Sequence, residues 1–114
     1  MARILVIEDE FFVAAHLDNV LSDSGHEVVG PVGTLDEATF LARAENLDAA
    51  LLDVNLAGGR VDEVADILAD RQVPFAFVTA YGVENLPPRH RNAGVVHKPF
   101  IDADLMREVR RLGR

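Results

Sequence analysis

Five short runs of apolar residues, separated by longer amphipathic segments, constrain the fold of this chain more than any other feature of its sequence. The runs occupy residues 4–7, 27–32, 49–52, 75–78 and 95–97. A continuous apolar run of this length is typical of a strand that is buried on both faces, as in a parallel sheet covered by helices. The second run contains Gly30 and Pro31, which predicts that it forms an edge of the sheet.

The segments between these runs have the spacing of amphipathic helices. We expect helices at residues 12–23, from 34 onward, and at 61–69, 87–94 and 102–112. Thr34 and Glu37 form a capping box. Pro87 and Pro88 can open a helix, and Gly94 is suited to end one. The alternation predicts one α/β domain over residues 1–114, with five βα units and a doubly wound parallel sheet.

The composition is that of an ordinary globular domain, and it excludes several classes of function. Of the 114 residues, 49% are hydrophobic and 26% are charged, and the formal net charge is −8. This charge disfavours binding to nucleic acid or to an anionic membrane surface. The absence of cysteine excludes disulfides and thiolate chemistry. Because the sequence has neither a membrane span of roughly 20 residues nor a signal-peptide pattern, we expect a cytoplasmic protein.

Polar or charged residues follow four of the predicted strands. Glu8 and Asp9 follow the first strand, Asp53 the third and Thr79 the fourth, and Lys98 lies at the end of the fifth. These side chains should lie together, because ligands in open α/β sheets bind at the carboxyl ends of the strands. Clustered carboxylates repel one another unless a cation such as Mg²⁺ offsets their charge. Together with a lysine and a hydroxyl donor, they predict phosphoryl transfer onto an aspartate.

The chain resembles the receiver domains of two-component response regulators over essentially its whole length. The motifs that support the resemblance are ILVIEDE, LLDVNLAGG, FVTAYG and HKPF. The FVTAYG segment further resembles an atypical, often single-domain subgroup with an F-A-T-G-Y-like motif. The resemblance implies a flavodoxin-like fold with strand order 2-1-3-4-5. It also implies Mg²⁺-dependent phosphorylation by a histidine kinase or a histidine phosphotransfer protein.

The resemblance assigns a role to each acidic residue of the predicted site. Asp53 corresponds to the phospho-acceptor and is also a Mg²⁺ ligand. Asp9 corresponds to a direct ligand of the ion, and Glu8 to a ligand that acts through water. The backbone carbonyl of Asn55 is a further ligand. Because no output domain follows the last predicted helix, we expect the signal to pass through a separate downstream protein, whose identity is unknown.

The resemblance also assigns the phosphate-binding residues, and the chain departs from the family pattern at the switch aromatic and in the loop after Asp53, which has Gly58 and Gly59 in place of the usual proline. Thr79 and Lys98 correspond to the residues that bind the phosphoryl oxygens, and the bond between Lys98 and Pro99 is expected to be cis. The usual switch aromatic, three residues before the lysine, is Val95 in this chain. Tyr81 is a candidate to replace it as the switch residue, although packing of the loop would explain this tyrosine equally well.

Three other functions are alternatives, and the sequence argues against two of them. The missing aromatic at position 95 leaves open a pseudo-receiver that binds partners without phosphorylation. A flavin carrier would need a phosphate-binding loop rich in small residues, where this chain has Glu8, Asp9 and Glu10. A phosphatase with an aspartate nucleophile would need an acid at position 55, which is Asn. We expect no enzyme in the ordinary sense, only self-catalysed phosphoryl transfer and slow self-dephosphorylation.

Several further residues have structural interpretations. Glu10 is interpreted as an acid in the first turn of a helix, where it favours the helix dipole. The four histidines have no metal-ligand spacing and are interpreted as structural or surface residues. Phe11 and Phe12 are either a docking patch beside the site or, for Phe12, part of the core.

Overall fold

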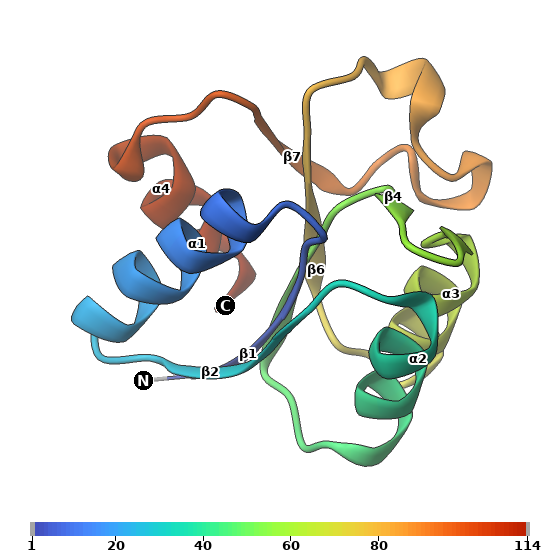
Figure 1. Ribbon diagram of the computed structural model, residues 1–114, viewed down its shortest axis with the longest axis horizontal. Helices are drawn as coiled ribbons and strands as arrows, with labels where there is room; N and C mark the ends of the chain where they lie inside the picture. The colour runs from blue at the N-terminus through green and yellow to red at the C-terminus, as the bar shows by residue number, and fades with distance from the viewer. Residues whose placement is uncertain (1, 114) are drawn as a thin grey trace.

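A five-stranded parallel sheet forms the centre of the computed structural model, which describes residues 2–113 (Figure 1). Its strands are β1 (Arg3–Ile7), β2 (Glu27–Val32), β3 (Ala49–Leu52), β6 (Phe75–Thr79) and β7 (Gly94–His97). They lie in the order β2-β1-β3-β6-β7, and every neighbouring pair is parallel. The predicted order 2-1-3-4-5 is therefore confirmed, with β6 and β7 as the fourth and fifth strands of the sheet. The run with Gly30 and Pro31 forms an edge, as expected.

Four α-helices cover the two faces of the sheet in pairs (Figure 1). The pair α1 (Phe11–Asp23) and α4 (Asp102–Leu112) lies on one face, and α2 (Leu35–Ala44) and α3 (Asp62–Asp70) lie on the other. Alternate side chains of each strand enter the two cores: Leu5 packs with the α2–α3 side, whereas Ile4 and Val6 pack with the α1–α4 side. Both faces are thus buried, which is why the strands have continuous apolar sequences.

A short hairpin follows β3 and was not predicted. It consists of β4 (Asn55–Leu56) and β5 (Gly59–Arg60), which pair antiparallel. The turn needs glycine, because Gly58 and Gly59 have φ angles of 100° and 144°, a region that other residues rarely adopt. A bridge between Thr34 and Ala57 joins the hairpin to the start of α2. The hairpin therefore fixes the chain directly after Asp53.

The predicted helix at residues 87–94 is wrong. The connection from β6 to β7 contains only two 3₁₀ turns, η1 (Val83–Asn85) and η2 (Pro88–His90). The two prolines explain the difference, because a residue before proline is driven out of the helical region. Leu86 and Pro87 both precede a proline, and both are extended, with ψ angles of 154° and 129°. Only the few residues after Pro87 remain, which are too few for an α-helix of ordinary length.

Polar contacts and one buried leucine hold this connection against α3 and the hairpin. Leu86 is buried in the core on the α2–α3 side. Asp66 of α3 accepts hydrogen bonds from Arg89 at 3.1 Å and from His90 at 2.6 Å. Arg60 of the hairpin donates to the backbone oxygen of Asn85 at 3.0 Å. The connection is thus attached to the segment that follows Asp53. None of the described helices is long and apolar enough to cross a membrane.

The N-terminal cap of α2 allows a matched test of the local structure. The Thr34 side chain accepts a hydrogen bond from the Glu37 backbone N–H at 3.2 Å. Thr34→Ala should reduce the free energy of unfolding by about 1 kcal/mol, because this N–H loses its partner. The control is Thr39→Ala in the same helix, where the hydroxyl donates to the Leu35 carbonyl and alanine has the higher helix propensity. Urea unfolding should show a loss for Thr34→Ala only, and equal losses would contradict the assigned cap.

Candidate active site

The buried polar side chains of the described residues gather at the carboxyl ends of the strands. They are Glu8 after β1, Asp53 after β3 and Thr79 at the end of β6. Lys98 follows β7 and completes the group. Burial of such groups is costly unless they are paired. Their presence together, at the edge where ligands bind in this class of sheet, identifies the candidate site.

Lys98 is the centre of this group. Its Nζ lies 2.8 Å from Glu8 Oε1, 2.9 Å from Glu10 Oε1 and 3.4 Å from Asp53 Oδ2. Burial alone would lower the pKa of Lys98, but the ion pairs with Glu8 and Glu10 outweigh it and raise the pKa above its ordinary value. The ammonium group therefore stays charged throughout the physiological pH range.

Glu8 is the most deeply buried acid of the site. Its Oε2 accepts a hydrogen bond from the Glu10 backbone N–H at 3.1 Å. Its Oε1 has the Lys98 ammonium as an ion-pair partner but, among the described residues, no hydrogen-bond donor with suitable geometry. Burial, which Lys98 offsets only in part, raises the pKa of Glu8 to about 7. The site therefore holds an acid that is half-protonated near neutral pH.

Asp53 and Thr79 are held by backbone groups at the same edge of the sheet. Asp53 Oδ1 accepts a hydrogen bond from the Val54 N–H at 2.8 Å, while Oδ2 faces Lys98. The hydroxyl oxygen of Thr79 accepts from the Tyr81 N–H at 3.1 Å. That bond leaves the hydroxyl hydrogen free to donate to a ligand. One backbone bond, from the Lys98 N–H to the Thr79 carbonyl at 2.9 Å, fixes the distance between these two strand ends.

Asp9 lies beside this group but is not one of the acids whose carboxylate oxygens are closest to one another. It lines a cavity of about 240 Å³ together with Asp53, Asn55, Tyr81 and Lys98. Burial, and then the neighbouring Asp53, raise the pKa of Asp9 above its ordinary value. The carboxylate oxygens that lie within 4.8 Å of one another belong instead to Glu8, Glu10 and Asp53. The structure thus brings Asp9 to the cavity but not into the tightest cluster of acids.

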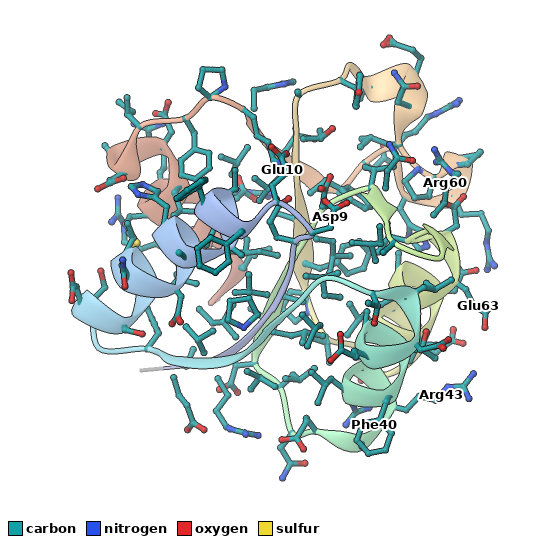
Figure 2. All side chains as sticks on the ribbon, in the orientation of Figure 1. Asp9, Glu10, Phe40, Arg43, Arg60 and Glu63 are labelled. Carbon is teal, nitrogen blue, oxygen red and sulfur yellow. The ribbon has the colours of Figure 1, made fainter. Side chains whose placement is uncertain are left out.

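The sequence interpretation did not place Glu10 in the site. The structure has Glu10 at the N-cap of α1, where its side chain makes no capping hydrogen bond. The carboxylate turns to Lys98 instead, and Figure 2 shows Glu10 beside Asp9 where β1 passes into α1. Its position directly after Glu8 and Asp9, at the end of the first strand, was the available signal, but an acid at this position is equally typical of a helix start.

The acids of the cavity fit a hard divalent cation. Mg²⁺ is bound in proteins by carboxylate, carbonyl and water oxygens, and this cavity is lined by three acids, Asp9, Glu10 and Asp53, and by Asn55. The buried Glu8 Oε1 without a donor is an acceptor of the kind that an ion or its bound water satisfies. The donor set therefore fits Mg²⁺.

Comparison with known proteins decides the family. Residues 4–110 match the response regulator receiver domain. The chain belongs to this family. SdrG from Sphingomonas melonis Fr1 superimposes with a TM-score of 0.86 at 34% identity, over 98% of this chain and 96% of SdrG. The receiver domain of a diguanylate cyclase from Desulfovibrio desulfuricans G20 gives 0.87 at 28% identity, over 99% and 94% of the two chains.

Two curated relatives are longer than this receiver domain. The transcriptional regulatory protein PdtaR of Mycobacterium tuberculosis is 32% identical over 108 residues, which cover 91% of this chain and 53% of PdtaR. The phyllosphere-induced regulator PhyR of Methylorubrum extorquens is 36% identical over 107 residues, which cover 90% of this chain and 40% of PhyR. This receiver domain thus spans about half the length of the curated relatives or less.

The position expected to hold a switch aromatic and the candidate to replace it lie next to the site. Val95 of β7 is half-buried and packs against the α2–α3 core. Tyr81 is exposed, and it lines the cavity that contains Asp53 and Lys98. The Lys98–Pro99 peptide bond is cis. The aromatic ring in the lining of this cavity therefore comes from Tyr81, on the loop after β6.

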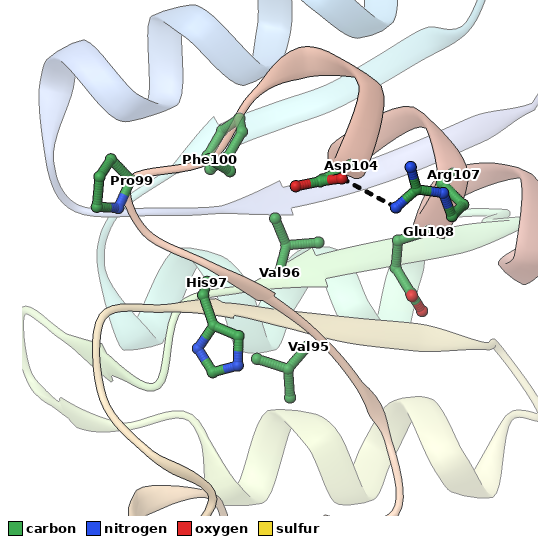
Figure 3. Close-up of a pocket in the computed structure, with 8 residues that line it drawn as sticks. All are labelled: Val95, Val96, His97, Pro99, Phe100, Asp104, Arg107 and Glu108. Carbon is green, nitrogen blue, oxygen red and sulfur yellow. Dashed lines mark hydrogen bonds and ion pairs between the residues drawn. The ribbon is translucent and has the colours of Figure 1, made fainter.

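A second and larger cavity, of about 330 Å³, lies between β7 and α4 (Figure 3). Its lining includes Val96, Phe100 and an ion pair between Asp104 and Arg107 at 2.9 Å. None of the acids that surround Lys98 lines it. The smaller cavity at the strand ends is therefore the candidate active site.

The raised pKa of Glu8 leads to a testable dependence of stability on pH. Its pKa is about 7 in the folded protein against 4.5 for an ordinary glutamate, so the folded state binds a proton that the unfolded state has lost. The contribution of Glu8 to stability therefore falls as the pH rises from about 4.5 to 7. Glu8→Gln should be more stable than the wild type at pH 8 by about 1–3 kcal/mol, and this difference should shrink towards pH 5.

Urea unfolding in EDTA, from pH 5 to pH 8.5, measures this difference. The control is Glu63→Gln on the exposed surface of α3, which should follow the wild-type curve. A Glu8→Gln curve that runs parallel to the wild type at every pH would show that the buried charge of Glu8 has no energetic cost.

Proposed function

We propose that this receiver domain accepts a phosphoryl group on Asp53 and passes the signal to a partner protein. The observation that supports this most directly is the approach of Lys98 Nζ to Asp53 Oδ2, at 3.4 Å, beside a cavity lined by both residues. A fixed cation beside a carboxylate that lines a cavity can bind the oxygens of a phosphoryl group while the carboxylate attacks its phosphorus. The family of the chain supports the same chemistry.

The proposed step transfers one phosphoryl group from a nitrogen or oxygen atom of the donor to a carboxylate oxygen of Asp53. An Asp53 carboxylate oxygen forms a bond to phosphorus, and the bond from phosphorus to the donor group breaks, so that the donor leaves with its electron pair. Lys98 and the hydroxyl hydrogen of Thr79 bind phosphoryl oxygens. Hydrolysis by water later restores the carboxylate and releases phosphate. No separate substrate is turned over, so the protein is proposed to be a switch and not an enzyme.

Mg²⁺ is the proposed cofactor. We propose that Asp9, Asp53 and the backbone carbonyl of Asn55 hold the ion, with Glu8 acting through water. When bound, Mg²⁺ would neutralise charge on the phosphoryl group and on the surrounding acids. The raised pKa values of Glu8 and Asp9, caused first by burial and then by the neighbouring Asp53, support this assignment, because a bound cation would stabilise the charged form of both carboxylates.

The proposed phosphodonor is a histidine kinase or a histidine phosphotransfer protein. An apolar surface suited to docking of such a donor lies next to the site. Phe11 and Phe12 are strongly exposed at the start of α1. Phe12 also lines a shallow apolar cavity with Lys98, Pro99 and Phe100. Exposed aromatic rings beside a reactive centre are typical of interaction surfaces, and a donor bound there would reach Asp53.

The proposed output passes through Tyr81 and the connection between β6 and β7. The Tyr81 N–H is bonded to the Thr79 hydroxyl oxygen, so a change in the position of that hydroxyl acts directly on the loop. The structure of PhyR from Bartonella quintana, 29% identical to this chain, is described as that of an anti-anti-sigma factor. By analogy, we propose a protein as the downstream partner. This role of Tyr81 fails if Tyr81→Ala accepts phosphate, loses it and binds its partner as the wild type does.

A pseudo-receiver that does not accept phosphate is the second candidate. It is favoured by Val95, which leaves β7 without an aromatic switch residue. It is disfavoured by the intact acids, threonine and lysine around the cavity.

Intact-mass measurement after incubation with acetyl phosphate tests the proposed function. The wild type should gain one phosphoryl group in Mg²⁺ and none in EDTA. Asp53→Ala should gain none, because it lacks the nucleophilic carboxylate. Asp70→Ala is the control, because it removes an exposed aspartate at the end of α3. An unmodified wild type whose spectra also do not change with beryllofluoride would contradict the proposal and support the pseudo-receiver.

A further inference from the structure

Three carboxylates surround the ammonium group of Lys98, and two of them accept hydrogen bonds from it. A lysine has three N–H donors and no acceptor. Glu10 and Asp53 accept hydrogen bonds at 2.9 and 3.4 Å, and Glu8 is an ion-pair partner at 2.8 Å. If Lys98 is to bind a phosphoryl oxygen on Asp53, as the proposed function requires, that oxygen competes with these carboxylates for the N–H donors and the positive charge of Lys98.

The exposed fractions of the three partners show which one is the easiest to release. The side chain of Glu8 is 0% exposed and that of Asp53 is 12% exposed, whereas that of Glu10 is 62% exposed. A buried carboxylate that loses its cation is left without solvation, which is costly. An exposed carboxylate is solvated by water instead, so an exposed ion pair is worth little. Glu10 is therefore the exchangeable partner of Lys98.

The backbone fixes Glu10 where it reaches Lys98. Its N–H donates to Glu8 Oε2, and its backbone is extended at the N-cap of α1 (φ −82°, ψ 115°). A glutamate at this position could interact with the free N–H groups of the first helical turn. Glu10 makes no such bond, and its carboxylate contacts the ammonium group from the solvent side.

We propose that Glu10 is a positioning residue that holds Lys98 in the unphosphorylated protein and competes with the phosphoryl group for it. This inference rests on the proposed function. The ammonium group of Lys98 is shared between Glu10 and Asp53. Its hydrogen bond to Glu10 must break before it can bind the phosphoryl oxygens in that direction. This competition lowers the rate at which Asp53 is phosphorylated by a given donor.

A different role of Glu10 predicts the opposite result. The carboxylates of Glu8, Glu10 and Asp53 lie within 4.8 Å of one another, so Glu10 could be a ligand of the metal ion. Glu10→Gln would then weaken Mg²⁺ binding and slow phosphorylation. If Glu10 instead competes for Lys98, the same variant should be phosphorylated faster in saturating Mg²⁺.

The test is a double-mutant cycle between Glu10→Gln and Lys98→Gln. The readout is the initial rate of Asp53 phosphorylation by acetyl phosphate in saturating Mg²⁺, followed by intact mass. This readout also measures slow variants over long incubations. Glu10→Gln should raise the rate by about two- to fivefold, as expected for loss of one exposed ion pair. In the Lys98→Gln background the same change should have no effect, because the residue through which Glu10 acts is absent.

Glu63→Gln controls for the change of net charge, because this side chain is exposed on α3 and points away from the site (Figure 2). Its rate should equal that of the wild type. Circular dichroism melting verifies that each variant is folded, and Lys98→Ala replaces Lys98→Gln if the latter does not fold. Beryllofluoride affinity is the second readout, and it should increase in Glu10→Gln by a similar factor.

Three results would overturn the inference. An unchanged or slower Glu10→Gln would show that Glu10 does not compete for Lys98. An equal acceleration with and without Lys98 would show that Glu10 repels the donor directly. A wild type that accepts no phosphate would overturn the proposed function as well, whereas a phosphorylated wild type without acceleration in Glu10→Gln overturns this inference alone.

Discussion

The ion pairs between Lys98 and three carboxylates are the interaction on which the candidate site depends. Without this ammonium group, Glu8 and Asp53 would be buried next to each other with no positive charge from the protein. Isolated buried charges are costly, and such acids take up protons instead. Lys98 offsets this cost only in part, because the pKa of Glu8 still rises to about 7. The protein is therefore left with an excess of negative charge in its cavity, which is the condition that favours binding of a divalent cation.

The fold explains how residues far apart in the sequence reach one cavity. Parallel strands place their carboxyl ends at the same edge of the sheet, and the apolar pairing of β1, β3, β6 and β7 fixes their register. Glu8, Asp53 and Thr79 are the first polar residues at their strand ends, and Lys98 directly follows His97 at the end of β7. The sheet thus supplies a rigid frame, whereas Tyr81 and Asn55 lie on the loop and hairpin beside it. Phosphorylation of Asp53 can therefore affect both segments directly, because Asp53, Asn55 and Tyr81 line the same cavity.

The sequence was sufficient to predict the parallel sheet and the residues at the strand ends, because both follow from apolar periodicity, whereas the strand order was predicted from the resemblance to receiver domains. It was insufficient for Glu10, whose partner Lys98 is 88 residues away and whose local context is that of a helix start. The prediction of a helix at residues 87–94 was wrong because each proline restricts the backbone of the residue before it, and this restriction outweighed the helix-start signal. The hairpin after Asp53 depends on Gly58 and Gly59, and glycine pairs alone do not distinguish a hairpin from an open loop.

A crystal structure of the protein with Mg²⁺ and beryllofluoride would test the central claim, that Lys98 moves from carboxylates to a phosphoryl group on Asp53. We expect beryllofluoride on an Asp53 carboxylate oxygen, with Lys98 Nζ and the Thr79 hydroxyl within hydrogen-bond distance of its fluorine atoms and with Glu10 released to solvent. An Asp53 without beryllofluoride at saturating concentration, or a Lys98 still bound to Glu8, Glu10 and Asp53 beside a bound mimic, would contradict it.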